Sequence, residues 1–252
     1  LTDMEFAELR YAGKPAAFLR GFRALYLALP VNTIILGWVN LAMVKILELT
    51  LGVSKPAAIA ITLGIAAFIL FYTGIAGLWS VLWTDVVQFI LKMGVVIALA
   101  VFAVSAVGGI GALKAKIAAA DALSGHSSLA FAPDWTSSWF VAFLAFLSLN
   151  WWASWYPGAE PGGGGYIAQR MFCAKDEKHS LGATLWFNIA HYAIRPWPWI
   201  LTALVALVLF PNPVDPATGK LDYERGYLLV MITHLPPSLR GLMLAGFAAA
   251  YM

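Results

Sequence analysis

Charged residues are scarce in this sequence. Asp, Glu, Lys and Arg make up 12% of its 252 residues, whereas a soluble domain carries roughly 25%. So few charges cannot cover a globular surface with polar groups, which excludes an ordinary soluble domain. Hydrophobic residues account for 61% of the chain, and the mean hydropathy is +0.79. We therefore expect a membrane protein whose solvent is the lipid bilayer.

Other features are missing as well. Cys173 is the only cysteine in the sequence, which excludes an intrachain disulfide framework. The net charge is only +3 and the basic residues are scattered, so we expect no nucleic-acid partner. The glycine-rich phosphate loops, the H-E-x-x-H zinc motif and the G-x-S-x-G nucleophile motif are absent. The sequence therefore predicts neither an organic cofactor nor an enzyme.

Long apolar runs without two-residue alternation dominate the chain. Backbone N–H and C=O groups inside a bilayer must pair within the protein, which leaves helices or closed barrels, and these runs favour helices. Gly74 and Gly77 mark a turn that divides the longest run. We predict an all-α, polytopic transmembrane helical bundle, a single transmembrane domain over residues 1–252. About six spans are expected, at 24–44, 57–73, 82–106, 135–156, 181–210 and from 238 onward.

The segments between these spans are more polar. They are expected to be a surface loop or short helix at 1–23, a polar connection at 108–134, a charged amphipathic segment at 166–180 and an aqueous loop at 211–237. Lys and Arg are divided evenly between the two sides, so the positive-inside rule gives no orientation. The chain starts at Leu1 rather than Met and stops within an apolar run. We therefore expect an internal fragment of a longer chain, with its last span truncated.

A non-helical stretch follows the fourth predicted span. Residues 157–165 contain two prolines and five glycines, which prevent a helix. If this stretch lies at membrane depth, it must line a cavity or be buried in protein. Broken helices of that kind build the binding sites of secondary transporters. The alternative is an ordinary aqueous loop after a complete span, and the sequence leaves both open.

Ionisable side chains lie in or near the predicted spans. Asp85 begins the third span and indicates either an ion or proton path or an interfacial carboxylate favoured by the helix dipole. His191 and Arg195 share a helical face; they either face a hydrated cavity or form a packed histidine beside a snorkelling arginine. Lys92 is expected to be a snorkelling or packing residue. An embedded enzyme with Asp85 or His191 as acid or base would need clustered polar groups, which the sequence does not indicate.

Four stretches of the chain, in order along nearly its whole length, resemble the sodium:solute symporter family. Residues 72–88, YTGIAGLWSVLWTDVVQ, resemble the family's G-G-L-x-A-V-x-x-T-D-x-x-Q signature, with Ala76 where glycine is usual. The other three stretches are residues 2–6 (TDMEF) followed by Arg10 and Tyr11, residues 166–175 (YIAQRMFCAK) and residues 239–252 (LRGLMLAGFAAAYM).

The resemblance implies a partial LeuT-type inverted-repeat fold. Such a fold has two inverted repeats of five helices, with the solute and sodium near the midplane. The chain would extend from the third helix of the first repeat to the third helix of the second. Residues 1–23 and 166–180 would then be cytoplasmic.

The activity implied by the resemblance is sodium-coupled symport of a small organic solute across the plasma membrane. Na⁺ would be the coupling ion, and the partners would be the solute and the lipid bilayer. Asp85 matches the family's motif aspartate near the sodium exit path, and Ala250 matches a residue whose carbonyl helps to bind sodium. The candidates for the substrate cavity are Asn150, Trp155, Tyr156, His191 and Tyr192. The alternative is a transporter-like membrane sensor joined to a signalling domain beyond residue 252.

Overall fold

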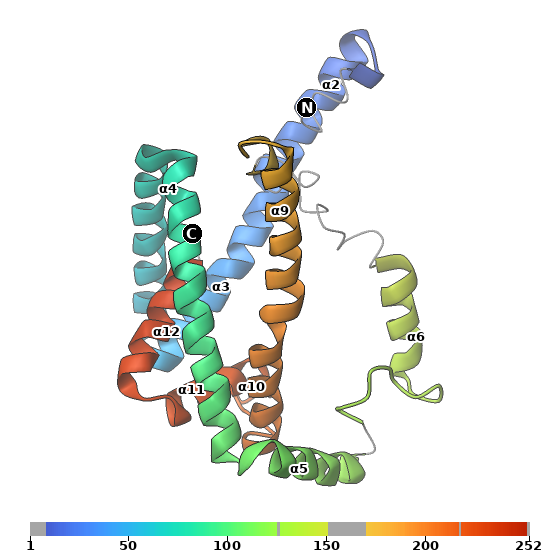
Figure 1. The fold of residues 1–252 in the computed structure, drawn as a ribbon, viewed down its shortest axis with the longest axis vertical. Helices are drawn as coiled ribbons and strands as arrows, with labels where there is room; N and C mark the ends of the chain where they lie inside the picture. The colour runs from blue at the N-terminus through green and yellow to red at the C-terminus, as the bar shows by residue number, and fades with distance from the viewer. Residues whose placement is uncertain (1–8, 125–126, 151–169, 217, 251–252) are drawn as a thin grey trace. The chain divides into compact units, whose positions relative to one another are not determined.

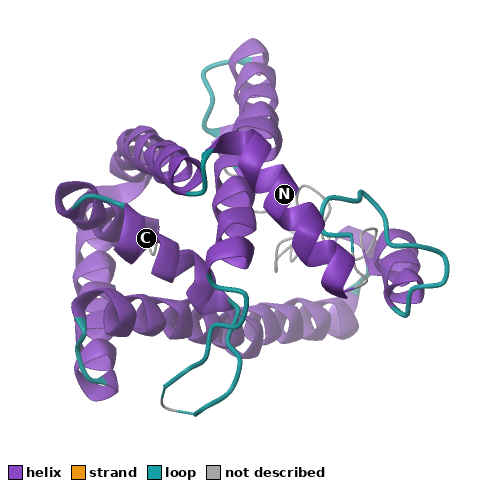
Figure 2. Cartoon of the chain, turned by 90° about the horizontal axis from the view of Figure 1, so that it is seen from below, coloured by secondary structure: helices purple, strands orange, loops and turns teal. Residues whose placement is uncertain are grey.

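The computed structural model describes residues 9–124, 127–150, 170–216 and 218–250. Within these ranges the chain consists of helices joined by turns and loops, with an isolated bridge between Val214 and Leu221 (Figure 2). The predicted all-α class is therefore confirmed. The chain divides into two compact units. The first unit comprises Leu1–Trp38 and Ala130–Ala190, and the second unit comprises Val39–Leu129 and His191–Met252.

The first unit begins with a long, nearly continuous helix. Helix α2 (Gly13–Tyr26) and the π turn η1 (Leu27–Val31) lead directly into α3 (Asn32–Leu51), which continues into the second unit. Pro30 lies inside η1, where its missing N–H interrupts regular α-helical bonding. The remaining elements are α6 (Trp139–Ala145), η2 (Phe146–Asn150), α9 (Glu177–Asn188) and the start of η3 (Ile189–Ile194).

Helix α9 begins where a carboxylate caps it. The side chain of Asp176 accepts a 2.9 Å hydrogen bond from the backbone N–H of His179, and its Oδ1 lies 2.8 Å from His179 Nδ1. These bonds, the backbone one foremost, hold the pKa of Asp176 below its ordinary value. A cap of this kind satisfies an N–H that the first turn leaves unpaired, which explains why α9 starts at Glu177.

The second unit is built on the helical hairpin α4 (Lys55–Ala106), whose two arms lie side by side (Figure 1). The arms meet at Gly77, which has non-helical backbone angles with φ of 67°, a conformation that glycine adopts without steric cost. A 3.1 Å hydrogen bond between the hydroxyls of Tyr72 and Thr84 joins the arms beside this turn. The predicted division of the apolar run near Gly74 and Gly77 is thus confirmed.

Two helices of the second unit occur in segments that the sequence predicted as polar connections. Helix α5 (Gly109–Ser124) occupies most of 108–134, and α11 (Glu224–His234) lies in the expected loop at 211–237. The segments were predicted from their overall polarity, whereas each helix buries apolar side chains. Leu113 and Ile117 form one buried face of α5, and Leu228, Val230 and Met231 are buried on several sides of α11. The unit also contains α10 (Pro196–Leu209) and α12 (Pro237–Ala250).

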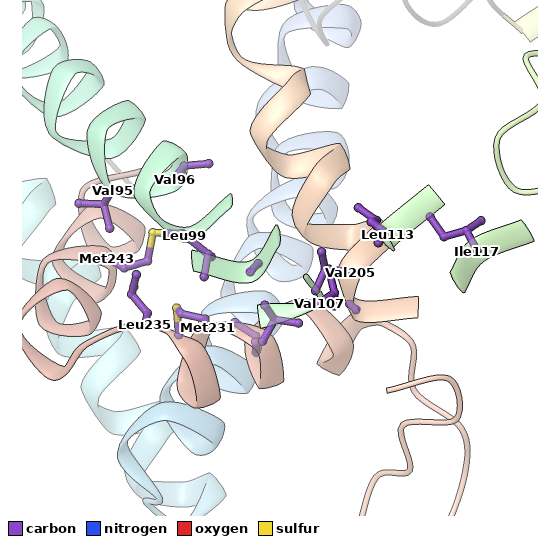
Figure 3. Packing of buried hydrophobic residues seen from close by; sticks show 14 residues of the cluster. Val95, Val96, Leu99, Val107, Leu113, Ile117, Val205, Met231, Leu235 and Met243 are labelled. Atoms are coloured by element: carbon purple, nitrogen blue, oxygen red, sulfur yellow. The ribbon is translucent and has the colours of Figure 1, made fainter. Parts of the chain in front are cut away.

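The core of the second unit lies where α5, α10, α11 and α12 meet the second arm of α4. Leu99 of α4, Val205 of α10 and Met231 of α11 are completely buried there. Figure 3 shows Met243 of α12 beside Val95 and Leu99. Close van der Waals packing is what holds helices together in a bilayer, so this cluster is a main source of the unit's stability.

Polar groups inside the second unit are mostly paired with backbone or stacked on rings. The buried hydroxyl of Thr202 donates to the carbonyl of Pro198 at 2.9 Å. Trp199 of α10 contacts the rings of Tyr227 on α11 and Phe247 on α12, at centroid distances of 4.8 and 6.3 Å. Burial raises the pKa of Tyr227, whose hydroxyl has no hydrogen-bond partner among the described residues.

An ion-pair group ties the loop before α11 to α3. Lys45 Nζ lies 3.2 Å from Asp222 Oδ2 and 2.5 Å from Glu224 Oε2. Within the loop and α11, Arg225 Nη1 lies 3.3 Å from Asp215 Oδ1. Lys45 is one-third exposed, whereas Asp222 is only 19% exposed. The Lys45–Asp222 pair is therefore better shielded from water than an ordinary surface ion pair.

Four helical stretches are long and apolar enough to cross a membrane. They are Gly13–Leu51, Lys55–Ile75, Val81–Ala106 and Glu177–Leu209, which contain or largely overlap four of the predicted spans. The shorter apolar helix Trp139–Leu149 lies within the span predicted at 135–156, whose later residues fall outside the described ranges. The last predicted span corresponds to α12.

Shortening Leu99 to alanine should strongly destabilise the fold. Leu99 is fully buried between helices, and Leu→Ala at such a site costs about 2–5 kcal/mol because a cavity remains. Unfolding of the full-length protein in detergent–SDS mixtures measures this loss. Leu91→Ala is the matched control on the same arm, since Leu91 is 47% exposed. Equal losses at the two positions would contradict the assigned core.

Replacing Lys45 with methionine should loosen the loop before α11. The change removes both ion pairs and leaves the carboxylate of Asp222 without its ammonium partner, a loss of about 1 kcal/mol for a partly exposed pair. Hydrogen exchange of the amides at 218–226 should speed up. Lys55→Met is the control, because Lys55 is an exposed lysine at the start of α4. Unchanged exchange in Lys45→Met would rule out the tether.

Candidate functional site

Polar residues line one face of the second arm of α4. Asp85, Gln88 and Lys92 follow one another at intervals of three and four residues, which places them on the same side of a helix. Lys92 Nζ donates a 3.4 Å hydrogen bond to Gln88 Oε1. Asp85 and Lys92 also interact electrostatically over a longer range. We call these three residues, together with His191 and Arg195, the polar cluster.

Asp85 lies near the beginning of this arm. It is the fifth residue of the stretch Val81–Ala106, and its side chain is exposed. The neighbouring Thr84 is held by the hydroxyl of Tyr72 from the other arm, so the Thr84–Asp85 pair is fixed just after the turn at Gly77.

His191 and Arg195 lie one turn apart at the junction of η3 and α10, as the sequence predicts. Arg195 Nη1 lies 3.1 Å from His191 Nδ1. Because arginine can only donate, His191 accepts with Nδ1 in this contact and carries its proton on Nε2. Arg195 also interacts electrostatically with Lys92, which links this helix to the polar face of α4.

Tyr192 lies beside His191 and is more accessible. The two rings meet edge to face, with centroids 4.8 Å apart and an interplanar angle of 86°. Tyr192 is 47% exposed, whereas His191 is partly buried. The pair therefore presents one phenol and one imidazole that can exchange hydrogen bonds with a polar ligand.

Lys92 packs against α12 through a glycine. A Cβ built on Gly246 would lie 3.2 Å from Lys92 Cγ, so the lysine stem rests directly on the α12 backbone. Ala250, the predicted sodium-binding residue, is the last residue of the same helix, one turn further along. The sequence predicted Lys92 as a snorkelling or packing residue, and the structure shows that its stem packs.

The remaining predicted site residues lie elsewhere. Asn150 is the last residue of η2 and belongs to the first unit. Trp155, Tyr156 and the stretch 157–165 lie outside the described residues. The structure thus shows His191 in contact with Tyr192 and Arg195, and Asp85 and Arg195 each acting on Lys92.

Sequence reasoning did not join Gln88 and Lys92 to Asp85. The spacing of the three residues would have shown that they share one helical face, because this spacing continues the periodicity of the buried face of the same helix. The contact between Lys92 and Gly246 joins residues from distant parts of the chain and has no local pattern.

The polar cluster has the chemistry of recognition rather than of bond breaking. It combines one carboxylate, two basic side chains, an amide and a neutral imidazole, which can exchange hydrogen bonds with a solute. Within the described ranges, no group of three or more His, Cys, Asp or Glu side chains is arranged to hold a metal ion.

Comparison with known proteins gives the family. The model of the sodium:solute symporter family, whose members are transporters rather than enzymes, matches residues 1–252. A sodium/myo-inositol cotransporter 2 from Sus scrofa is 28% identical over 215 residues, which cover 75% of this chain and 30% of the relative. The chain thus spans about a third of the length of that curated relative. Together with its apolar helices, the family match over the whole sequence shows that the chain belongs to the sodium:solute symporter family of membrane transporters.

Proposed function

We propose that the protein containing this chain moves a small organic solute across the plasma membrane by symport with sodium. The observation that carries the proposal is the family match along all 252 residues. The four apolar helical stretches and the polar face on one of them support it, because a transporter needs polar side chains inside a bundle.

The proposed architecture is a LeuT-type inverted repeat, of which this chain forms one part of a single transmembrane domain. Helix α3 and the two arms of α4 would be the third to fifth helices of the first repeat. Helix α6, the α9–α10 stretch and α12 would be the first three helices of the second. Alternating access in such folds comes from the movement of one helix bundle against another. Sodium would favour the outward-open state by binding that state more tightly.

Within this scheme, two residues would act on sodium. The backbone carbonyl of Ala250 would contribute a ligand at the end of α12, and the carboxylate of Asp85 would attract the ion on its exit path. The remaining candidates, Asn150, Trp155, Tyr156, His191 and Tyr192, would line the substrate cavity. The exposed Tyr192 and the Nε2–H of His191 suit a ligand rich in hydroxyl groups.

A cyclic polyol is the first solute to test. The curated relative is named as a cotransporter of sodium and myo-inositol, and hydroxyl groups match the donors and acceptors of His191 and Tyr192. The experiment is uptake of labelled myo-inositol into proteoliposomes that contain the full-length protein, with sodium or choline outside. Saturable uptake that requires sodium supports the proposal, and a parallel screen of sugars, amino acids and carboxylates identifies another solute. Sodium-independent uptake of every solute would reject symport with sodium.

Asp85→Asn should weaken the sodium dependence of uptake. A unit charge roughly 6–12 Å from the ion, at an effective dielectric near 20, contributes about 1.4–2.8 kcal/mol, so its loss should raise the half-saturating sodium concentration about tenfold to a hundredfold. Asp134→Asn is the control, because Asp134 is an exposed aspartate outside the helices. If the sodium titrations of both variants coincide with that of the wild type, Asp85 does not have the role assigned to it.

His191→Phe should raise the KM for the solute without altering the sodium titration. Loss of one neutral hydrogen bond costs about 0.5–1.5 kcal/mol, or roughly twofold to tenfold in affinity. The matched control is His234→Phe, a partly buried histidine at the end of α11. If both variants keep the wild-type KM, His191 does not contact the solute.

A further inference from the structure

Lys92 lies near the middle of an apolar span. It belongs to the stretch Val81–Ala106, between Leu91 and Met93. A charged side chain at such a depth is costly and is kept only where it faces protein or a hydrated cavity. Lys92 is partly buried, and its ammonium donates to the neutral Gln88. Among the residues that the structure describes, no carboxylate forms an ion pair with it.

Among the described residues, one carboxylate and one further basic side chain act on Lys92. Asp85 lies two turns toward the start of the arm, and the guanidinium of Arg195 acts on Lys92 from the start of α10. His191 accepts a hydrogen bond from Arg195, which requires its neutral form.

The position of Gly246 directs the charge of Lys92 toward α12. Lys92 lies against Gly246, while Val95 and Leu99, further along α4, lie beside Met243, which is earlier in α12 (Figure 3). The two helices therefore run in opposite directions at this contact. Going from Gly246 to Ala250 along α12 corresponds to going from Lys92 back to Gln88 along α4.

The ammonium of Lys92 points along the same direction. Its hydrogen bond to Gln88 shows that the side chain bends toward the start of the arm, as long side chains on helices do. Ala250 is one helical turn beyond Gly246, about 5–6 Å along the axis. The ammonium and the end of α12 thus lie at corresponding levels of the two helices.

We propose that Lys92 sets the sodium affinity of this transporter: its fixed positive charge beside the end of α12 weakens sodium binding there and speeds sodium release. The inference rests on the proposed function, in which the carbonyl of Ala250 binds sodium. Asp85 and Lys92 then act in opposite senses on one ion, the carboxylate attracting it toward the exit and the ammonium repelling it from the site.

The test is direct binding of ²²Na⁺ to the purified full-length protein in detergent, measured by scintillation proximity. Lys92→Met removes the charge and keeps an unbranched stem against Gly246. It should lower the sodium concentration for half-saturation about tenfold to a hundredfold, as expected for removing a unit charge roughly 6–12 Å away at an effective dielectric near 20. Lys92→Gln is a second neutral variant in case methionine disturbs folding, and Lys92→Arg, which keeps the charge, should stay close to the wild type.

Lys114→Met is the matched control, because Lys114 is an exposed lysine on α5. Folded neutral variants that bind sodium no more tightly than the wild type would overturn the role of Lys92 while leaving symport intact. A variant that loses only solute uptake, with an unchanged sodium titration, would also overturn it. A wild type that binds no sodium would reject the proposed function itself, so the two failures are distinct.

Discussion

Burial of one face of the second arm of α4 is the constraint on which the second unit depends. Helices α5, α10, α11 and α12 all pack on that face or around its end, and Leu99 lies at the centre of the contact. Sequences that span bilayers gain little from moving an apolar side chain out of lipid, so association there relies on close packing. In this unit the close packing is seen in the complete burial of Leu99, Val205 and Met231.

The same face changes character along its length. Residues 85, 88, 92, 95, 99 and 103 follow one another at intervals of three or four, so they form one continuous seam on the helix. Its first half is polar and its second half is apolar, and the change falls at Lys92. Because α12 runs antiparallel across this change, its early turns are fixed by apolar packing, whereas its last turn lies along polar groups. A helix anchored at one end and solvated at the other can hold a binding residue near a hydrated path.

The sequence was sufficient for features set by local composition. Uncharged runs located the four apolar stretches, and Gly77 located the hairpin turn, since few other residues tolerate its backbone angles. The one-turn spacing predicted that His191 and Arg195 share a helical face, and the contact between them agrees with it. Helices α5 and α11 were missed because their stability comes from burying apolar side chains against helices that are distant in the sequence. The partner of Lys92 could not be predicted either, because only the folded chain brings Gly246 to it.

The contact between Lys92 and Gly246 links two positions that are far apart in the sequence. A side chain at 246 would meet the lysine stem at 3.2 Å, closer than ordinary van der Waals packing allows. A side chain at 246 would therefore force the lysine stem to shift by a few tenths of an ångström. In related chains, a small residue at position 92 would free position 246 to carry alanine or serine. The two positions should therefore change together during evolution, although neither is adjacent to the other in any local motif.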